Sequence, residues 1–466
     1  MAIDFEHPEY KANIDRWKLC EDICTARNVE KYLITLNPDD QSPENRTRNK
    51  QYEERAVFYP VTGHTLAGLT GLMFSKDPTI TLPAQLEYML EDVDGSGVSI
   101  YQQMQDATRE VQKKGRCGLY VSYPKTEGPV SRAQMEQGGF VATMHQITAE
   151  QVINWRTEKV GGKQTLSLVV ISETAEEVQP DGYEIKEIPQ LRELALEGGV
   201  FIVREWQKDR NDKWVPISEH MPTDSAGRTW SEIPFIFIGA TSTSPSVDEP
   251  PLYPMAEINK AHYRNSADYE DSVWYVGQAQ PWASGLNQTH IDLMKKYNMY
   301  VGSRNLMSVP EGQTFAFASA PPNTMVKEAM ADKLEMMIGM GARFIQGNGQ
   351  VKTATEAEGD AQAQYSGLAM VSANISEAYT MALGWAMQYM GVMDDGAGVE
   401  TTTDFVSPSA TAEDINAMVA GFIQGAIPVG DYFRWLKKVD LTDSEKTLEE
   451  FSAELSTTEM PDFSDG

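Results

Sequence analysis

Residues 251–276 read PLYPMAEINKAHYRNSADYEDSVWYV and hold neither a glycine nor a proline after Pro254. Because glycine and proline interrupt helices most strongly, this composition predicts one unbroken helix. At 1.5 Å per residue it would be about 35 Å long. A second helix is predicted over about 324–346, where Asn323 or Thr324 can cap its start. Two long helices separated by a short segment decide the architecture of this part of the chain.

The segment 277–322 predicts a small α/β unit inserted between these two helices. It indicates a strand, a short helix over 288–296, a loop and a strand over 314–318, followed by Pro321-Pro322. Beyond the second helix, the glycine-rich stretch 347–350 interrupts the pattern. A long helix then runs from about 355 to 391, because alanine and leucine favour helix.

The first 250 residues predict helices followed by strands. The helices cover 8–35, 50–75 and 98–114, with a loop over 36–49. Six strands are expected, at 117–123, 140–147, 164–172, 200–206, 214–217 and 233–238. This order indicates the α+β class. The glycines from Gly63 to Gly71 lack the spacing of a dinucleotide-binding loop, so we expect them to allow close helix packing.

The C-terminal quarter is predicted to be less compact. A strand is expected over 400–406, and two short helices within 410–438, joined at 425–428. After Asp440 the chain is acidic and has few large apolar residues. Such a composition predicts a disordered or loosely attached tail.

The chain has 466 residues, a formal net charge of −29 and 41% hydrophobic residues. It can therefore bury a core, while its charge repels phosphate and argues against a conventional DNA-binding module. The acidity fits either high solubility or a surface past which DNA slides. Three cysteines, Cys20, Cys24 and Cys117, indicate no disulfide framework, and we expect neither a signal peptide nor a membrane span.

Motifs for catalysis are missing from the sequence. Gly162-Lys163-Gln164 lacks the rest of a phosphate-binding loop, and the six histidines show no metal spacing. Asp268, Glu270 and Asp271 could bind magnesium as in a nuclease, but on a helix Glu270 points away from the other two. A solvated helix face is the other interpretation. We therefore expect no enzyme activity, no catalytic residue, no metal and no cofactor.

Five of the 23 methionines lie on the second long helix, at Met325, Met330, Met336, Met337 and Met340. One interpretation is adaptable core packing, since methionine fills irregular gaps. The other is an interface that slides or re-packs during a working cycle.

Four segments resemble the portal proteins of tailed bacteriophages. They are 55–78 (RAVFYPVTGHTLAGLTGLMFSKDP), 262–268 with 280–282 (HYRNSAD and QPW), 340–343 with 352–357 (MGAR and KTATEA), and 422–432 (FIQGAIPVGDY). Each is moderately specific, but the ordered set spans most of the chain. The resemblance implies a wing over 1–250, stem helices over 251–276 and 323–346 and a clip over 277–322. It further implies a tunnel loop over 347–354, a long helix and strand returning to the wing over 355–408, a small helical crown over 409–440, and the acidic tail 441–466.

The resemblance also implies a function. Portal proteins form homo-oligomeric rings, usually of twelve subunits, at one capsid vertex. The ring is the channel for packaging and ejection of double-stranded DNA, without sequence specificity. It is also the docking platform for the terminase large subunit and later for a head-to-tail adaptor. The major capsid protein or scaffold would be a further partner. The protein would be in the host cytoplasm before assembly and in the virion afterwards.

Two sets of site residues follow from the resemblance. The tunnel loop facing DNA would comprise Gly347, Asn348, Gly349, Gln350, Val351, Lys352 and Thr353. The clip interface between subunits would comprise Trp282, Leu286, Met294, Phe315 and Phe317. The alternatives are another virion assembly protein, such as an adaptor or minor capsid protein, and a metal-dependent nuclease.

Overall fold

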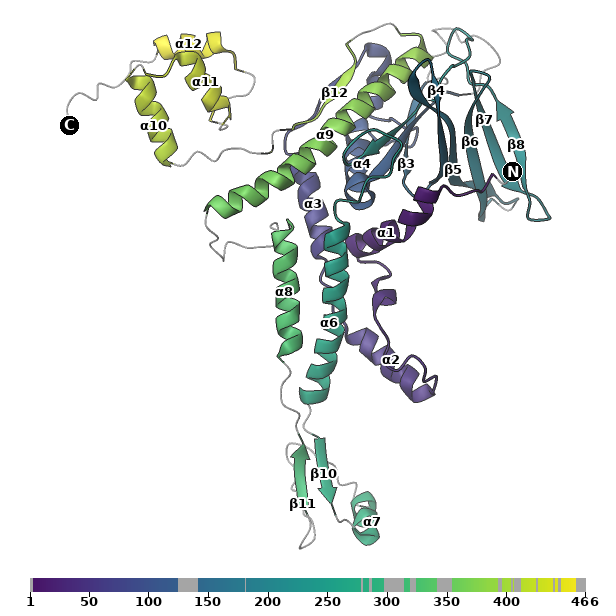
Figure 1. The fold of residues 1–466 in the computed structure, drawn as a ribbon, viewed down its shortest axis with the longest axis vertical. Helices are drawn as coiled ribbons and strands as arrows, with labels where there is room; N and C mark the ends of the chain where they lie inside the picture. The colour runs from purple at the N-terminus through teal and green to yellow at the C-terminus, as the bar shows by residue number, and fades with distance from the viewer. Residues whose placement is uncertain are drawn as a thin grey trace.

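A computed structural model shows an α+β body from which two helices, α6 and α8, project side by side (Figure 1). A strand pair and a short helix lie at their far end, and a small helical group lies apart on the C-terminal side. The structure describes residues 3–124, 141–180, 182–277, 280–284, 287–296, 314–318, 324–341, 354–392, 396–403, 405, 412–424, 426–438, 441–442 and 446–457. Across those residues, no helix is both long and apolar enough to span a bilayer.

The body is built from the N-terminal helices, most of the strands and the long helix α9. Its helices are α1 (Pro8–Thr25), α2 (Pro43–Arg55), α3 (Val61–Met73), α4 (Ile100–Lys114) and α9 (Ala354–Met390), with 3-10 turns at Val29–Tyr32 and Ala84–Leu90. Its strands are β1 (Thr79–Thr81), β2 (Arg116–Ser122), β3 (Thr143–Thr148), β4 (Val152–Val160), β5 (Lys163–Val178), β6 (Ile185–Glu197), β7 (Val200–Lys208), β8 (Trp214–His220), β9 (Phe235–Gly239) and β12 (Gly398–Glu400).

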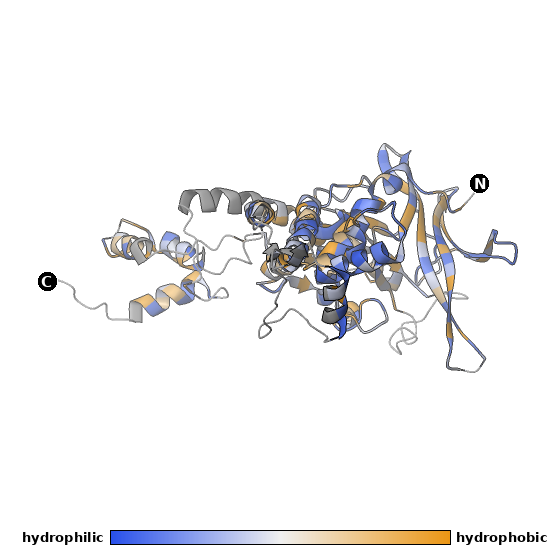
Figure 2. Cartoon of the chain, turned by 90° about the horizontal axis from the view of Figure 1, so that it is seen from below, coloured by the Kyte–Doolittle hydropathy of each residue, from blue (hydrophilic) through white to orange (hydrophobic). Residues whose placement is uncertain are grey.

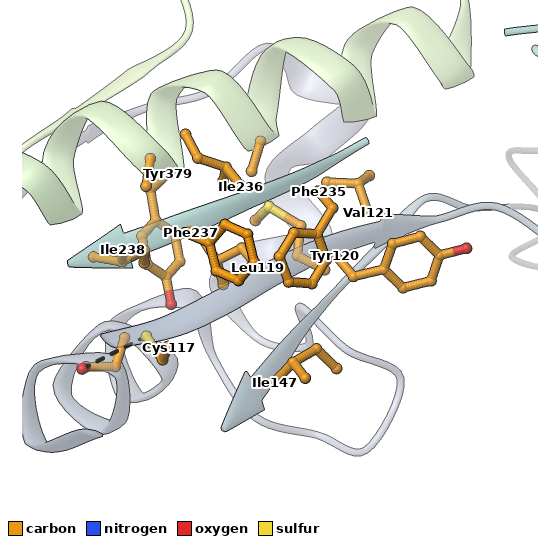
Figure 3. Packing of buried hydrophobic residues seen from close by; sticks show 14 of the residues in the cluster. Cys117, Leu119, Tyr120, Val121, Ile147, Phe235, Ile236, Phe237, Ile238 and Tyr379 are labelled. Atoms are coloured by element: carbon orange, nitrogen blue, oxygen red, sulfur yellow. Dashed lines mark hydrogen bonds between the residues drawn. The ribbon is translucent and has the colours of Figure 1, made fainter. Parts of the chain in front are cut away.

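The body holds two larger antiparallel sheets. The first has the order β3-β2-β9, and the second is a meander, β4-β5-β6-β7-β8. Every residue of β9 is buried, and apolar side chains of β2 and β9 pack beneath α9, whose Tyr379 is fully buried (Figure 3). The long strands of the second sheet alternate apolar and polar residues, as a sheet with one solvated face requires (Figure 2).

Helix α4 confirms the helix predicted over 98–114. The Ser99 hydroxyl accepts a hydrogen bond from the Gln102 amide, and the Gln102 side chain accepts one from the Ser99 amide. Gly115 ends the helix with φ of 73°, the left-handed conformation that glycine adopts at low cost. A Cβ at Gly115 would lie 2.3 Å from the carbonyl oxygen of Asp248, so both the backbone angle and the space require glycine there.

The predicted boundaries of the first two helices are wrong. The expected helix over 8–35 ends at Thr25, because Ala26 and Asn28 adopt positive φ. The expected loop over 36–49 contains the start of α2, with Ser42 as its cap and Pro43 in the first turn. The expected helix over 50–75 is two helices, which separate around Pro60. Pro43 occupies the first turn of α2, where proline is favoured, so here it marks the start of a helix and not a loop.

Three strands were not predicted. Strand β6 contains Pro189 and several charged residues, a composition that argues against a central strand. It nevertheless pairs with both β5 and β7, and its Arg192 Nε donates to Glu173 Oε1 of β5 at 2.9 Å. Strands β4 and β1 were also missed, and the strand expected over 400–406 is the short β12, which pairs with β1.

The C-terminal group contains α10 (Ala412–Ile423), α11 (Val429–Lys438) and α12 (Leu448–Thr457). The first two confirm the predicted pair of short helices. Within the tail 441–466, predicted to be disordered or loosely attached, residues 448–457 form α12, while 443–445 and 458–466 lie outside the described residues. Thr447 and Glu450 form reciprocal capping contacts at its start, and Phe451 packs 4.8 Å from Phe433 of α11. A few apolar residues are enough to order a helix when a neighbouring helix packs against them.

Candidate functional site

The candidate site is the projecting pair α6 (Tyr253–Gly277) and α8 (Met325–Gly339) with the unit between them. The helices run antiparallel, so Met255 and Ile258 of α6 form a small apolar cluster with Met337 and Leu334 of α8. At their far end lie strands β10 (Gln280–Ser284) and β11 (Thr314–Ala318) and helix α7 (Gln288–Lys296). The strands pair antiparallel from Gln280 opposite Ala318 to Ser284 opposite Thr314. This order matches the element order predicted for 251–346.

Buried polar contacts join α6 to the body. Asn259 is fully buried, and its Oδ1 accepts hydrogen bonds from the Thr62 amide at 3.1 Å and the Thr62 hydroxyl at 3.0 Å. Its Nδ2 donates to the Tyr59 carbonyl at 2.9 Å. One turn further on, burial and the nearby Lys333 of α8 lower the pKa of His262 below its usual value. The first turns of α6 are therefore fixed to α3, while the rest of the helix projects.

Helix α2 braces the projecting part of α6. Arg48 and Arg55 of α2 both donate to the Asp271 carboxylate, and the Tyr52 hydroxyl donates to Asp268 Oδ1 at 2.7 Å. The Arg55 guanidinium also lies 4.4 Å from the ring centroid of Trp274. The hydrogen bond from Arg48 is the main cause that holds the pKa of Asp271 below its ordinary value.

These contacts change the interpretation of the three carboxylates at 268–271. Asp268 and Asp271 share a helix face, as predicted, but that face packs against α2, so the interpretation as a wholly solvated face is wrong for Asp271. Its carboxylate oxygens are occupied by arginine rather than open to a cation. Within the described part of the chain, no group of three acidic, histidine or cysteine side chains is arranged to hold a metal.

The methionines of α8 divide between core and surface. Met337 is fully buried against α6, but Met325, Met336 and Met340 are 75%, 57% and 44% exposed. Core packing therefore explains Met337, whereas Met330 is half-buried and the other three side chains are exposed.

The predicted clip residues lie partly outside the described structure. Trp282 is on β10 and is 46% exposed. Phe315 and Phe317 are on β11, opposite Ala283 and Pro281, and Met294 is on α7. Leu286 lies outside the described residues. The predicted tunnel-loop residues Gly347, Asn348, Gly349, Gln350, Val351, Lys352 and Thr353 also lie outside them.

Sequence reasoning missed the brace formed by α2. A signal was present, because Arg48, Tyr52 and Arg55 recur at the spacing of one helix face. These residues are polar, however, so a search for apolar periodicity does not detect them. Its partners lie more than 200 residues away, and no local pattern points to them.

Comparison with known proteins gives one partial family match. A model described as Domain of unknown function (DUF4055) matches residues 251–390, which span the projecting helices, the unit between them and all of α9. No curated protein matches the chain. A solved chain from the virion of a native gene transfer agent particle is 12% identical, with a TM-score of 0.42, over 81% of this chain and 90% of that one. A chain from the neck of an empty gene transfer agent particle is 13% identical, with a TM-score of 0.43, over 79% and 87%.

Proposed function

We propose that this chain is a portal protein: a subunit that forms a ring, of about twelve copies in the family it resembles, around a channel for double-stranded DNA. One observation carries the proposal. Helices α6 and α8 project from an α+β body as an antiparallel pair, with a small α/β unit inserted between them (Figure 1). The body would be the wing, α6 and α8 the stem, the unit of β10, β11 and α7 the clip, and α10 and α11 the crown.

The charge of the chain supports a passive channel. Each subunit carries a formal charge of −29, and a ring concentrates that charge around one axis. Tight DNA binding depends on basic residues that displace counterions from phosphate, and an acidic channel provides few of them. DNA would therefore not be bound tightly at any one position as it moves through the channel.

The energy for packaging would come from a partner. The sequence has no phosphate-binding loop of the form Gly-x-x-x-x-Gly-Lys-Ser/Thr, so we assign nucleotide hydrolysis to a terminase that docks on the clip. After packaging, a head-to-tail adaptor would take its place.

Residues 347–353 would line the channel, where Lys352 and Asn348 could contact phosphates without reading bases.

Negative-stain electron microscopy of the purified chain, combined with its mass in solution, tests the proposal. We expect rings with a central hole and a mass of many subunits of 51.9 kDa. A monomer or a compact dimer at all concentrations would overturn it. Closed assemblies without a through-channel would instead favour another virion assembly protein. Magnesium-dependent nicking of plasmid DNA, abolished by Asp268→Asn, would favour the nuclease.

A further inference from the structure

Three buried polar residues of α6 share one face of the helix. Asn259, His262 and Ser266 follow one another at intervals of three and four residues, so their side chains point to the same side. The two outer ones bind the segment 57–62, which leads into α3. Asn259 does so through the contacts described above. The Ser266 hydroxyl donates to the Val57 carbonyl at 2.7 Å and accepts from the Val57 amide at 3.2 Å.

His262, between these two residues, is bonded less completely. It is only 6% exposed, and its Nδ1 has no hydrogen-bond partner among the described residues. The ring of Tyr59 lies 6.5 Å away, measured between ring centroids. A buried polar atom without a partner is uncommon and costs stability. The helix therefore holds a titratable group at a position where its neighbours on either side are fully bonded.

His262 also belongs to the contact between α6 and α8. It follows Met255 and Ile258 by seven and four residues, and those two side chains pack against α8. Lys333 of α8 is the charged group that acts on His262 across this contact. The apolar cluster that joins the two helices here is small. The position of His262 thus makes the contact sensitive to any charge that the imidazole acquires.

No carboxylate among the described residues forms an ion pair with His262. The segment 57–62 contributes no charged side chain. The remaining charged groups on the neighbouring turns of α6, α8 and α3 are paired elsewhere or exposed: Glu257 with Lys260, Arg264 with the Tyr32 carbonyl, and Asp332, Glu335 and His64 in solvent. A proton on His262 would therefore face Lys333 without a compensating negative charge.

We infer that His262 makes the packing of α8 on α6 proton-sensitive: when its ring is protonated, two cations face each other inside the contact, and α8 separates from α6. A charge that is buried without a partner is strongly unfavourable, and a like charge nearby adds to the cost. Separation of the helices exposes both cations to water and removes that cost. The inference concerns the chain itself and holds whether or not the chain forms a ring.

The direction of the pH dependence follows from the same contacts. Burial, and then Lys333, hold the pKa of His262 below its usual value while the helices are packed. In the separated form it would return to about 6.5. The contact is therefore fully stable above that pH and loses stability as the pH falls from there toward the lower pKa of the packed form. At about pH 5.5 the separated form can become up to about tenfold more populated.

Hydrogen–deuterium exchange of α8, read by mass spectrometry, tests the inference. Wild type and His262→Gln are compared at the same pH, because the intrinsic exchange rate then cancels. Burial also lowers the pKa of His7 and His145 in the body, and the same comparison removes their effect. On passing from about pH 7.5 to about pH 5.5, the rate of wild type relative to His262→Gln should rise about three- to tenfold. A ratio that stays the same at both pH values would overturn the inference.

Lys333→Met provides a second test that leaves His262 in place and does not depend on how well His262→Gln folds. Acid should accelerate exchange of α8 at least about twofold less in this variant than in wild type, because the repelling charge is missing. An undiminished acid response would contradict the separation of α8. The matched control is His64→Gln, at an exposed histidine of α3, which should behave as wild type at both pH values. A change as large as that of His262→Gln would show a general acid response and overturn the inference.

Discussion

Arg48 of α2 binds Asp271 of α6 through two parallel hydrogen bonds, Nη1 to Oδ1 at 2.7 Å and Nη2 to Oδ2 at 2.5 Å. Asp271→Asn removes the charge from this contact and from the one with Arg55. We expect the free energy of unfolding to fall by about 1–3 kcal/mol, as is typical for hydrogen bonds to charged groups. Urea denaturation measures this change. Asp106→Asn, at an exposed pair within α4, should change stability by less than about 1 kcal/mol.

The same contact predicts a pH dependence. The pKa of Asp271 is depressed in the folded chain, mainly by the hydrogen bond from Arg48. The stabilisation is therefore fully present above the unfolded pKa of about 4, and is lost as the pH falls through the lower folded pKa. The stability difference between the wild type and Asp271→Asn should shrink in acid. A difference that stays constant from neutral pH to below pH 3 would contradict this assignment.

Two glycines of α3 should respond oppositely to alanine. A Cβ at Gly63 would lie 2.3 Å from the Cys24 carbonyl oxygen of α1, whereas a Cβ at Gly71 would meet nothing within 4 Å. Gly63→Ala should lower the free energy of unfolding by about 1–3 kcal/mol through overpacking. Gly71→Ala should raise it by roughly 0.5–1 kcal/mol, because alanine favours helix. Equal effects at both positions would mean that α1 and α3 do not pack closely.

Helix α12 should resist proteolysis because it packs on α11. Phe451→Ala removes the contact with Phe433, and aromatic pairs contribute about 0.5–1.5 kcal/mol. A glutamate-specific protease should then cut after Glu449 and Glu454 about two- to tenfold faster. Ser452→Ala, at an exposed position of the same helix, is the control. Rapid cleavage of the unmodified chain at both glutamates would restore the expectation of a disordered tail.

The clip prediction concerns assembly rather than folding. Deleting 280–318 should leave a folded body, because no described residue of that segment belongs to the body's core cluster, but should abolish rings. Trp282→Ala should weaken rings, since exposed tryptophan is often a principal contact of an interface. We expect about a tenfold lower ring fraction by analytical ultracentrifugation. Tyr183→Ala, at a position 93% exposed in the turn between β5 and β6, should leave assembly unchanged.

The tunnel-loop prediction rests on sequence and on the proposed function. Lys352→Ala should leave the ring intact and alter packaging only modestly, because an exposed pairing with phosphate contributes about 1 kcal/mol or less. Gly347→Pro with Gly349→Pro should reduce the packaged genome length more, since proline removes the freedom that glycine gives the backbone. Normal genome length in the double proline variant would refute a working role for the loop.

The sequence alone predicted the projecting unit well. Residues 251–276, 288–296 and 314–318 match α6, α7 and β11 closely, and 98–114 matches α4. In these segments the decisive information is local. Helix-breaking residues are missing inside the segments, and Ser99 with Gln102 and Gly115 mark the ends of α4 by capping chemistry that acts within a few residues. Such signals can be read without knowing what the segment contacts.

The tertiary structure decided the elements whose stability comes from distant partners. Strand β6 exists because β5 and β7 satisfy its backbone on both edges despite Pro189, and α12 exists because α11 covers Phe451. Asp271 is part of a brace only because folding brings α2 to α6, and Met336 is a surface residue only because α6 covers the opposite side of α8. Burial, pairing and pKa depend on neighbours that folding brings close, and composition does not specify those neighbours.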